Sequence, residues 1–173
     1  MHAHRLRKGR YSASGQIYLI TTVTINRQPF FADWHCGRQV VRTLREHEQQ
    51  ATTLAFVVMP DHLHWLMQLK QGDLPRLMQQ VKATSAWHIN QALARTGPLW
   101  QHGYHDHALR KEEDLASIAR YIVANPLRAG LVRQIGITRY GTPSGCKGAI
   151  RGQKDALVSL GEHQLAMQRW AWA

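Results

Sequence analysis

The segment that most constrains the fold is an apolar run that leads through a short turn into a second run. Residues 54–59 are apolar at every position, which predicts a strand that is buried on both faces and central in its sheet. Pro60 and Asp61 leave a connection of only two residues. Residues 62–69 are therefore expected to return antiparallel beside the first strand. A chain organised around such a hairpin is expected to build an antiparallel sheet.

The returning strand carries two histidines one residue apart, His62 and His64. Successive side chains of a strand alternate between faces, so both imidazoles are expected on the same face. Two imidazoles can bind one divalent ion, but they leave most of its coordination sphere unfilled. A metal site therefore needs a third ligand from elsewhere in the chain. A pair of solvated or core-edge histidines is the alternative interpretation.

The remaining elements follow from local periodicity and capping residues. Residues 17–24 are rich in β-branched side chains and predict a strand, and a further strand is expected in the second half of 100–110. Helical spacing predicts three helices, from Asp33 to about residue 50, from Asp73 to about residue 96, and from about residue 112 to Asn125. Pro126 is expected to end or kink the third helix at Asn125. The order of these strands and helices along the chain predicts an α+β fold, an α/β sandwich in which a small antiparallel sheet carries helices on one face.

Positive charge is concentrated at the two ends of the chain. The protein has 22 Lys and Arg against 11 Asp and Glu, a net charge of +11, and its first ten residues contain four bases and no acid. We divide the chain into a basic N-terminal arm (1–15), a folded domain (16–132) and a basic C-terminal tail (133–173). Basic ends on a nearly balanced domain are typical of a polyanion binder, although a solubilising basic surface or a membrane-adhering tail is the alternative.

The cysteine content and the hydropathy predict a cytoplasmic protein. Only Cys36 and Cys146 are present, without a Cys-x-x-Cys pair, so neither a disulfide framework nor a thiolate zinc site is expected. The longest uninterrupted apolar stretch, residues 54–59, is far too short to cross a bilayer. We expect no membrane association.

The third predicted helix supplies the candidate partners of the histidine pair. At 100° per residue, Tyr121 and Asn125 share one flank, about 80–120° from the centre of the apolar face formed by Leu115, Ile118, Ala119 and Ile122. The Asn125 side-chain oxygen is the candidate third metal ligand. A phenol beside a divalent metal is a plausible nucleophile toward phosphorus. The alternatives are that Asn125 only terminates the helix and that Tyr121 only packs at the surface.

Two motifs resemble those of a known family. Residues 59–64 (Met-Pro-Asp-His-Leu-His) and residues 119–132 (Ala-Arg-Tyr-Ile-Val-Ala-Asn-Pro-Leu-Arg-Ala-Gly-Leu-Val), together with the segment 99–110 between them, closely resemble the HUH single-tyrosine transposases, specifically the bacterial REP-associated tyrosine transposases. The resemblance extends over about residues 18–132. It implies the ferredoxin-like HUH fold and a metal-dependent single-stranded DNA endonuclease and strand-transferase that acts at REP-like hairpins.

The resemblance also implies roles for individual residues. His62 and His64 match the metal-binding pair of the family, Tyr121 its nucleophile, and Asn125 the polar residue that completes the metal site, where related enzymes often have glutamine. The implied cofactor is Mg²⁺ or Mn²⁺; imidazole ligation favours Mn²⁺, and cellular abundance favours Mg²⁺. The implied partner is single-stranded or hairpin DNA, bound by a monomer or homodimer associated with the nucleoid.

Further side chains are candidates for contact with DNA. Lys and Arg follow a nucleic-acid backbone, and aromatic side chains stack on unpaired bases. The polar strand near residue 105 has two histidines that share a face; hydrogen bonds to DNA or to metal ligands, or simple exposure, explain them as readily as a second metal site. The candidates are Arg5, Arg7, Lys8, Arg10, His105, His107, Arg128, Arg133, Arg139, Lys147 and Arg151.

Two other functions fit part of these observations. A non-catalytic nucleic-acid-binding domain on the same fold accounts for the charge but leaves the histidine pair and Tyr121 without a role. A metal nuclease that activates water accounts for the metal site but does not need Tyr121.

Overall fold

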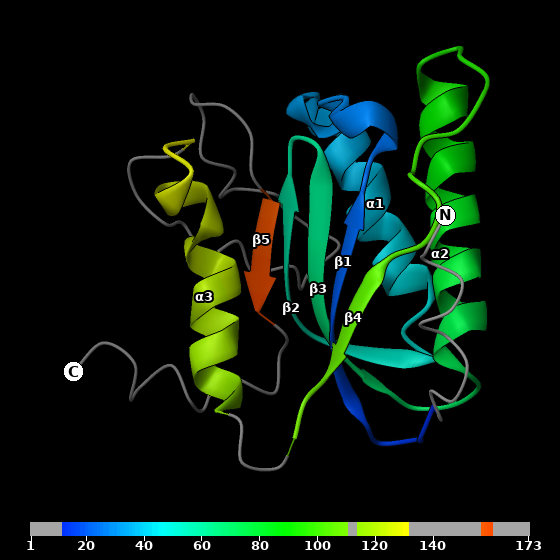
Figure 1. Cartoon of the computed structure of the whole chain (residues 1–173). Helices are drawn as coiled ribbons and strands as arrows, with labels where there is room; N and C mark the ends of the chain where they lie inside the picture. The colour runs from blue at the N-terminus through cyan, green and yellow to red at the C-terminus, as the bar shows by residue number, and fades with distance from the viewer. Residues whose placement is uncertain (1–11, 111–113, 132–156, 161–173) are drawn as a thin grey trace, which may run out of the picture.

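The described residues form a sheet of five strands in the order β4-β1-β3-β2-β5, and every neighbouring pair is antiparallel (Figure 1). This computed structural model describes residues 12–110, 114–131 and 157–160. The strands are β1 (Ile17–Val23), β2 (Ala51–Met59), β3 (His62–Leu69), β4 (His105–Ala108) and β5 (Leu157–Leu160). The predicted hairpin is confirmed, because β2 and β3 pair antiparallel with Met59 opposite His62.

Three α-helices in the described part of the chain complete the fold, and an aspartate caps each of them. They are α1 (Trp34–Glu46), α2 (Leu74–Ala92) and α3 (Leu115–Arg128). The side chains of Asp33, Asp73 and Asp114 accept hydrogen bonds from first-turn backbone amides, as expected at helix N-termini. None of the helices among the described residues has the length and hydropathy needed to span a membrane.

The helices lie on both faces of the sheet, which corrects the prediction that they share one face. Figure 1 shows α3 on one side of the sheet and the α1–α2 pair on the other. Alternate residues of β2 account for this arrangement: Phe56 and Val58 pack in the core with α1 and α2, whereas Val57 and Met59 pack with α3. The α+β class and the antiparallel sheet are confirmed.

Two boundaries near the C-terminus differ from the expected ones. Helix α3 continues through Pro126 to Arg128 instead of ending or kinking at Asn125. The missing amide of Pro126 costs one hydrogen bond, but the last turn is closed by bonds from Ala129 to the Asn125 carbonyl and from Leu131 to the Pro126 carbonyl. Strand β5 lies inside the segment predicted as a tail and pairs with β2, so this part of the segment extends the sheet.

Candidate active site

The histidine pair lies on the sheet face that α3 covers. Trp65 and Met67 of β3 pack toward α1 and α2, whereas Leu66 packs with α3, so His62 and His64 share the α3 face with Leu66. The two imidazole centroids are 4.8 Å apart and the rings meet edge to face at 83°. The predicted common orientation of His62 and His64 is confirmed.

The Nδ1 atom of His62 is held by the neighbouring carboxylate. It lies 2.6 Å from Oδ1 of Asp61, while Nη1 of Arg27 donates to the other oxygen, Oδ2, at 2.9 Å. Partial burial by itself raises the pKa of Asp61, but the hydrogen bonds and charges of His62 and Arg27 outweigh it and leave the pKa below its ordinary value. Asp61 is therefore an ionised acceptor at neutral pH, and His62 presents Nε2 away from it.

The Nδ1 atom of His64 has a different partner. It lies 2.8 Å from Oγ1 of Thr21 on β1, which is directly opposite in the sheet register. Burial, with a further contribution from the nearby His62, lowers the pKa of His64 to about 4. His64 is consequently neutral at physiological pH, which is the protonation state that a metal ligand needs.

This shift predicts a specific pH dependence. An unfolded chain protonates His64 near pH 6.5, whereas the folded protein does so only near pH 4. Because the unfolded state binds the extra proton in this interval, the contribution of His64 to stability is complete above pH 6.5 and is lost as the pH falls to 4. NMR titration of the His64 ring in the metal-free protein is expected to show a midpoint near 4, and a midpoint near 6.5 would contradict this placement.

The two imidazoles fit a divalent metal, and among the described residues no histidine, cysteine or carboxylate forms a three-ligand cluster with them. Each ring uses Nδ1 for its hydrogen bond, and neither Nε2 has a hydrogen-bond partner among the described residues. A ligating histidine usually has its second nitrogen fixed in this way. No cluster of three or more His, Cys, Asp or Glu side chains suited to a metal occurs in the described part of the chain. Within the described part of the chain, an amide oxygen or water is the ligand type left to complete such a site.

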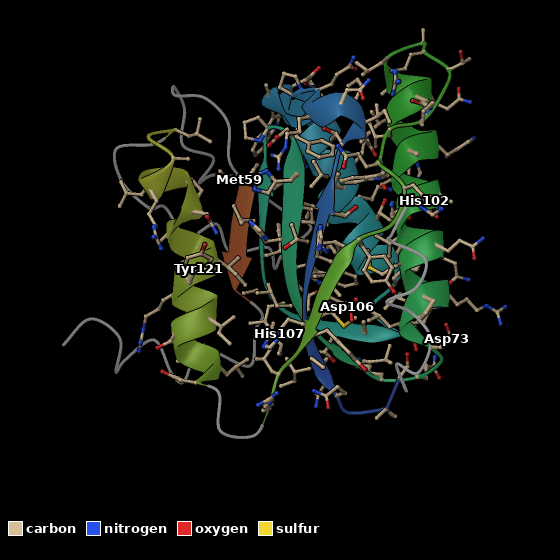
Figure 2. All side chains as sticks on the ribbon, viewed as in Figure 1. Met59, Asp73, His102, Asp106, His107 and Tyr121 are labelled. Carbon is tan, nitrogen blue, oxygen red and sulfur yellow. The ribbon has the colours of Figure 1, made fainter. Side chains whose placement is uncertain are left out.

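Helix α3 lies on the predicted face but turns Tyr121 away from the sheet. The buried residues of α3 are Ala119, Ile122, Val123 and Pro126. The centre of the buried face is therefore rotated from the centre of the apolar face that the sequence predicts. At 100° per residue, Tyr121 lies about 150° and Asn125 about 110° from this centre. Tyr121 is 50% exposed, and Figure 2 shows it on α3.

No described hydrogen bond joins Tyr121 or Asn125 to the histidine pair. Nδ2 of Asn125 donates to the backbone carbonyl of Tyr121 at 3.3 Å, which leaves the Asn125 side-chain oxygen for another partner. The Arg128 guanidinium lies 5.0 Å from the centroid of the Tyr121 ring. The sequence prediction therefore holds for the sheet face, and the roles of Tyr121 and Asn125 stay predictions.

The second pair of histidines lies on the same sheet face as the first. Thr21 of β1 stands opposite His64 on one side and opposite His105 on the other, and Leu19 stands opposite His107. With a strand spacing of about 4.8 Å, the His64 and His105 backbones lie about 10 Å apart. His105 and His107 are both exposed. The rings can therefore reach a ligand that extends across the sheet.

Most of the predicted DNA-contacting residues lie outside the described part of the chain. His105, His107 and Arg128 are described, and each is exposed. The others fall in the ranges 1–11 and 132–156, and their predicted role rests on the sequence alone; they are Arg5, Arg7, Lys8, Arg10, Arg133, Arg139, Lys147 and Arg151.

Three residues around the histidine pair escaped the sequence analysis. The sequence pattern places Asp61 in the turn and in the motif of residues 59–64 without giving it a role, and it does not single out Thr21 or Arg27. A carboxylate next to a candidate metal ligand is a recognisable signal, because such groups often orient ligating histidines. No comparable signal identifies Thr21, since its contact with His64 depends on the register of β1 against β3.

Comparisons with known proteins identify a single family. Residues 12–125 match the family model described as IS200-like transposase, which covers most of the domain predicted from sequence. The matched range contains the His62–His64 pair, Tyr121 and Asn125.

Relatives and a solved structure agree with that match. A Haemophilus influenzae protein assigned as a REP-associated tyrosine transposase is 28% identical over 134 residues, covering 70% of this chain and 76% of the relative. The Escherichia coli REP-associated tyrosine transposase is 29% identical over 85 residues, covering 47% of each chain. The solved structure of a REP-associated tyrosine transposase bound to a REP hairpin superposes on this chain with a TM-score of 0.58 at 24% identity. The match covers 73% of this chain and 75% of that one and supports a shared fold.

Proposed function

Because the chain belongs to the IS200-like transposases, we propose that it cleaves and rejoins single-stranded DNA at REP-like hairpins through a covalent bond to Tyr121. The observation that carries this proposal is the paired arrangement of His62 and His64, each fixed through Nδ1 and each with Nε2 available on the sheet face that carries α3. A non-catalytic DNA-binding domain would have no use for two imidazoles anchored in this way.

His62 and His64 would hold a divalent ion, Mg²⁺ or Mn²⁺, with the side-chain oxygen of Asn125 as a third ligand. Bound there, the ion supplies Lewis-acid polarisation of a non-bridging phosphate oxygen. The protein contributes the orientation of the two rings, and the low pKa of His64 keeps that ring neutral and able to bind a cation.

Tyr121 performs the covalent step. Its hydroxyl oxygen attacks phosphorus in line, the bond from phosphorus to the 3′ oxygen breaks, and the products are a 5′-phosphotyrosine and a free 3′-hydroxyl. The phenolic proton passes to solvent and the leaving oxygen takes up a proton. Tyr121 is half-exposed, so its hydroxyl is accessible to a DNA strand that approaches this face. Rejoining is the reverse reaction with a 3′-hydroxyl as the nucleophile.

The experiment that tests the proposal uses hairpin-containing single-stranded DNA and Mn²⁺. The full-length protein is incubated with labelled strands that carry an imperfect hairpin and single-stranded flanks. The expected result is a protein–DNA adduct that survives denaturing electrophoresis, together with a fragment that ends in a 3′-hydroxyl. Cleavage without an adduct would favour a nuclease that activates water, and binding without cleavage would favour a DNA-binding domain.

DNA binding is expected to weaken steeply as salt is added. The basic arm and tail would displace counterions from phosphates, and each neutralised phosphate of a single strand contributes about −0.7 to the slope of log K against log salt. Replacing Arg5, Arg7, Lys8 and Arg10 together by Gln is expected to reduce the magnitude of the slope by up to about 3. Fluorescence anisotropy at several salt concentrations measures both slopes, and a flat response of the wild-type protein would exclude the polyanion interpretation.

A further inference from the structure

The turn that precedes His62 is clamped by a neighbouring loop. Between β1 and α1, residues 24–31 run beside Pro60 and Asp61, and three polar contacts fix the turn backbone. The Thr24 amide donates to the Asp61 carbonyl at 2.8 Å, the Phe31 amide donates to the Pro60 carbonyl at 3.0 Å, and Oγ1 of Thr24 lies 3.0 Å from the Asp61 carbonyl. Thr24 is fully buried. These contacts set the position of the turn and need no side chain beyond Thr24.

The same loop places one charged side chain on the Asp61 carboxylate. Arg27 has a φ of +53°, and the preceding Asn26 has a φ of +50°. Left-handed backbone is common for Asn but unusual for Arg, and two such residues in succession make a tight turn. This conformation brings Nη1 of Arg27 to 2.9 Å from Oδ2 of Asp61. Unusual backbone that is retained beside a candidate active site suggests a local function.

The Asp61 carboxylate is shared between two partners, one for each oxygen. Oδ2 accepts from Arg27, and Oδ1 accepts from His62. A carboxylate that is 22% exposed and has only one partner can rotate, but Arg27 removes this freedom. With Oδ1 fixed, Nδ1 of His62 is held as the donor to that oxygen, and Nε2 takes no part in this bond.

We propose that Arg27 is a positioning residue of the metal centre: it acts through Asp61 to hold His62 in the tautomer and orientation that bind a divalent cation. The inference rests on the proposed metal site, but part of its test needs no metal. Arg27 contacts neither the metal position nor the reacting phosphate in this role.

The sign of the effect on cation affinity distinguishes positioning from simple electrostatics. Arg27 is a positive charge close to a cation site, so its removal should strengthen cation binding if charge alone mattered. If Arg27 holds the ligand in place, Arg27→Met should weaken binding. Partners of ligating histidines typically account for 10- to 100-fold in affinity, and because Arg27 acts one residue further away, we expect a loss of about 3- to 10-fold.

The chain offers a closely matched control. Arg42 pairs with Glu46 at 2.8 Å, and the Arg42 side chain is 64% exposed, against 2.9 Å and 67% for Arg27 with Asp61. Glu46 in turn lies 3.6 Å from Nε2 of His88, so Arg42, Glu46 and His88 form a second group of Arg, carboxylate and His. His88 belongs to α2 and lies outside the proposed site. Arg42→Met therefore removes the same kind of ion pair and the same charge.

The experiment measures Mn²⁺ affinity by calorimetry for the wild type and for Arg27→Met, Arg42→Met, Asp61→Ala and the Arg27→Met/Asp61→Ala double variant. We expect Arg27→Met to weaken binding, Arg42→Met to leave it unchanged, and Arg27→Met to have no further effect once Asp61 is absent, because the residue acts through that carboxylate. Unchanged or tighter Mn²⁺ binding by Arg27→Met would overturn the proposal. A loss of DNA affinity with normal Mn²⁺ binding would also overturn it and make Arg27 a phosphate contact.

A second measurement uses the metal-free protein. The ¹⁵N shifts of the His62 ring, recorded at about pH 8 where an ordinary imidazole is neutral, report which nitrogen carries the proton. We expect Nδ1–H in the wild type, a larger Nε2–H population in Arg27→Met, and partial recovery in Arg27→Lys. Identical tautomer populations in wild type and Arg27→Met would overturn the inference. If the wild type binds no Mn²⁺, the proposed metal site fails, and this comparison still decides the role of Arg27.

Discussion

Replacing Tyr121 by Phe is expected to abolish the covalent protein–DNA adduct while leaving DNA binding intact. The change removes only the hydroxyl that would attack phosphorus, and removal of a covalent nucleophile can cost up to about a million-fold in rate. We therefore expect cleavage to fall by at least a factor of about a thousand. Denaturing electrophoresis of labelled hairpin DNA incubated with Mn²⁺ measures the adduct, and anisotropy measures binding.

The exposure of Tyr121 makes this variant a clean test. A side chain that is 50% exposed contributes little to the core, so Tyr121→Phe should fold like the wild type. Arg128→Met is a suitable companion, because it removes the guanidinium over the Tyr121 ring but keeps the hydroxyl. This companion should still form the adduct at saturating DNA, and its DNA affinity should fall if Arg128 contacts DNA as predicted. Normal cleavage by Tyr121→Phe would exclude a tyrosine mechanism and favour a nuclease that activates water.

The hairpin and its histidines could be predicted from sequence because their determinants are local. A two-residue connection after residues 54–59 admits an antiparallel return, and the alternation of side chains in a strand then places His62 and His64 on one face. The structure has β3 at His62–Leu69, the range predicted. The helix caps at Asp33 and Asp73 were also predictable, since each depends on a side chain beside the first helical turn.

The positions of α3 and β5 depend on contacts between distant segments. Periodicity identifies which side of a helix is apolar, but it does not say which face of the sheet that side covers. One signal was available, because residues 54–59 are apolar on both faces and a strand of that kind needs cover on both sides of the sheet. The orientation of Tyr121 depended further on Val123 and Pro126, which joined the buried face and turned the tyrosine toward solvent. Strand β5 pairs with a partner about 100 residues away, and local pattern gives little information about such pairing.

Replacing both His62 and His64 by Gln is expected to eliminate Mn²⁺ binding and to reduce cleavage by at least about a thousand-fold. Metal polarisation of a phosphate contributes several kcal/mol to the stability of the transition state, and each 1.36 kcal/mol is a factor of ten in rate. Gln keeps a polar side chain of similar length, and neither histidine belongs to the apolar clusters on the two faces of the sheet. Thermal unfolding of the metal-free variant checks that the fold is retained. Calorimetry measures metal binding, and hairpin cleavage measures activity.

The matched control is His105→Gln together with His107→Gln. These residues have the same side-chain type on the same sheet face, but β1 separates them from His64, and both are exposed. If they contact DNA, their replacement weakens hairpin binding and leaves Mn²⁺ affinity unchanged. If they hold the metal, the two double variants exchange results: Mn²⁺ binding survives without His62 and His64 and disappears without His105 and His107. That outcome would move the metal centre to β4, which is two strand spacings, a total of roughly 10 Å, away from β3. It would leave Asp61, Thr21 and Arg27 as purely structural partners of His62 and His64.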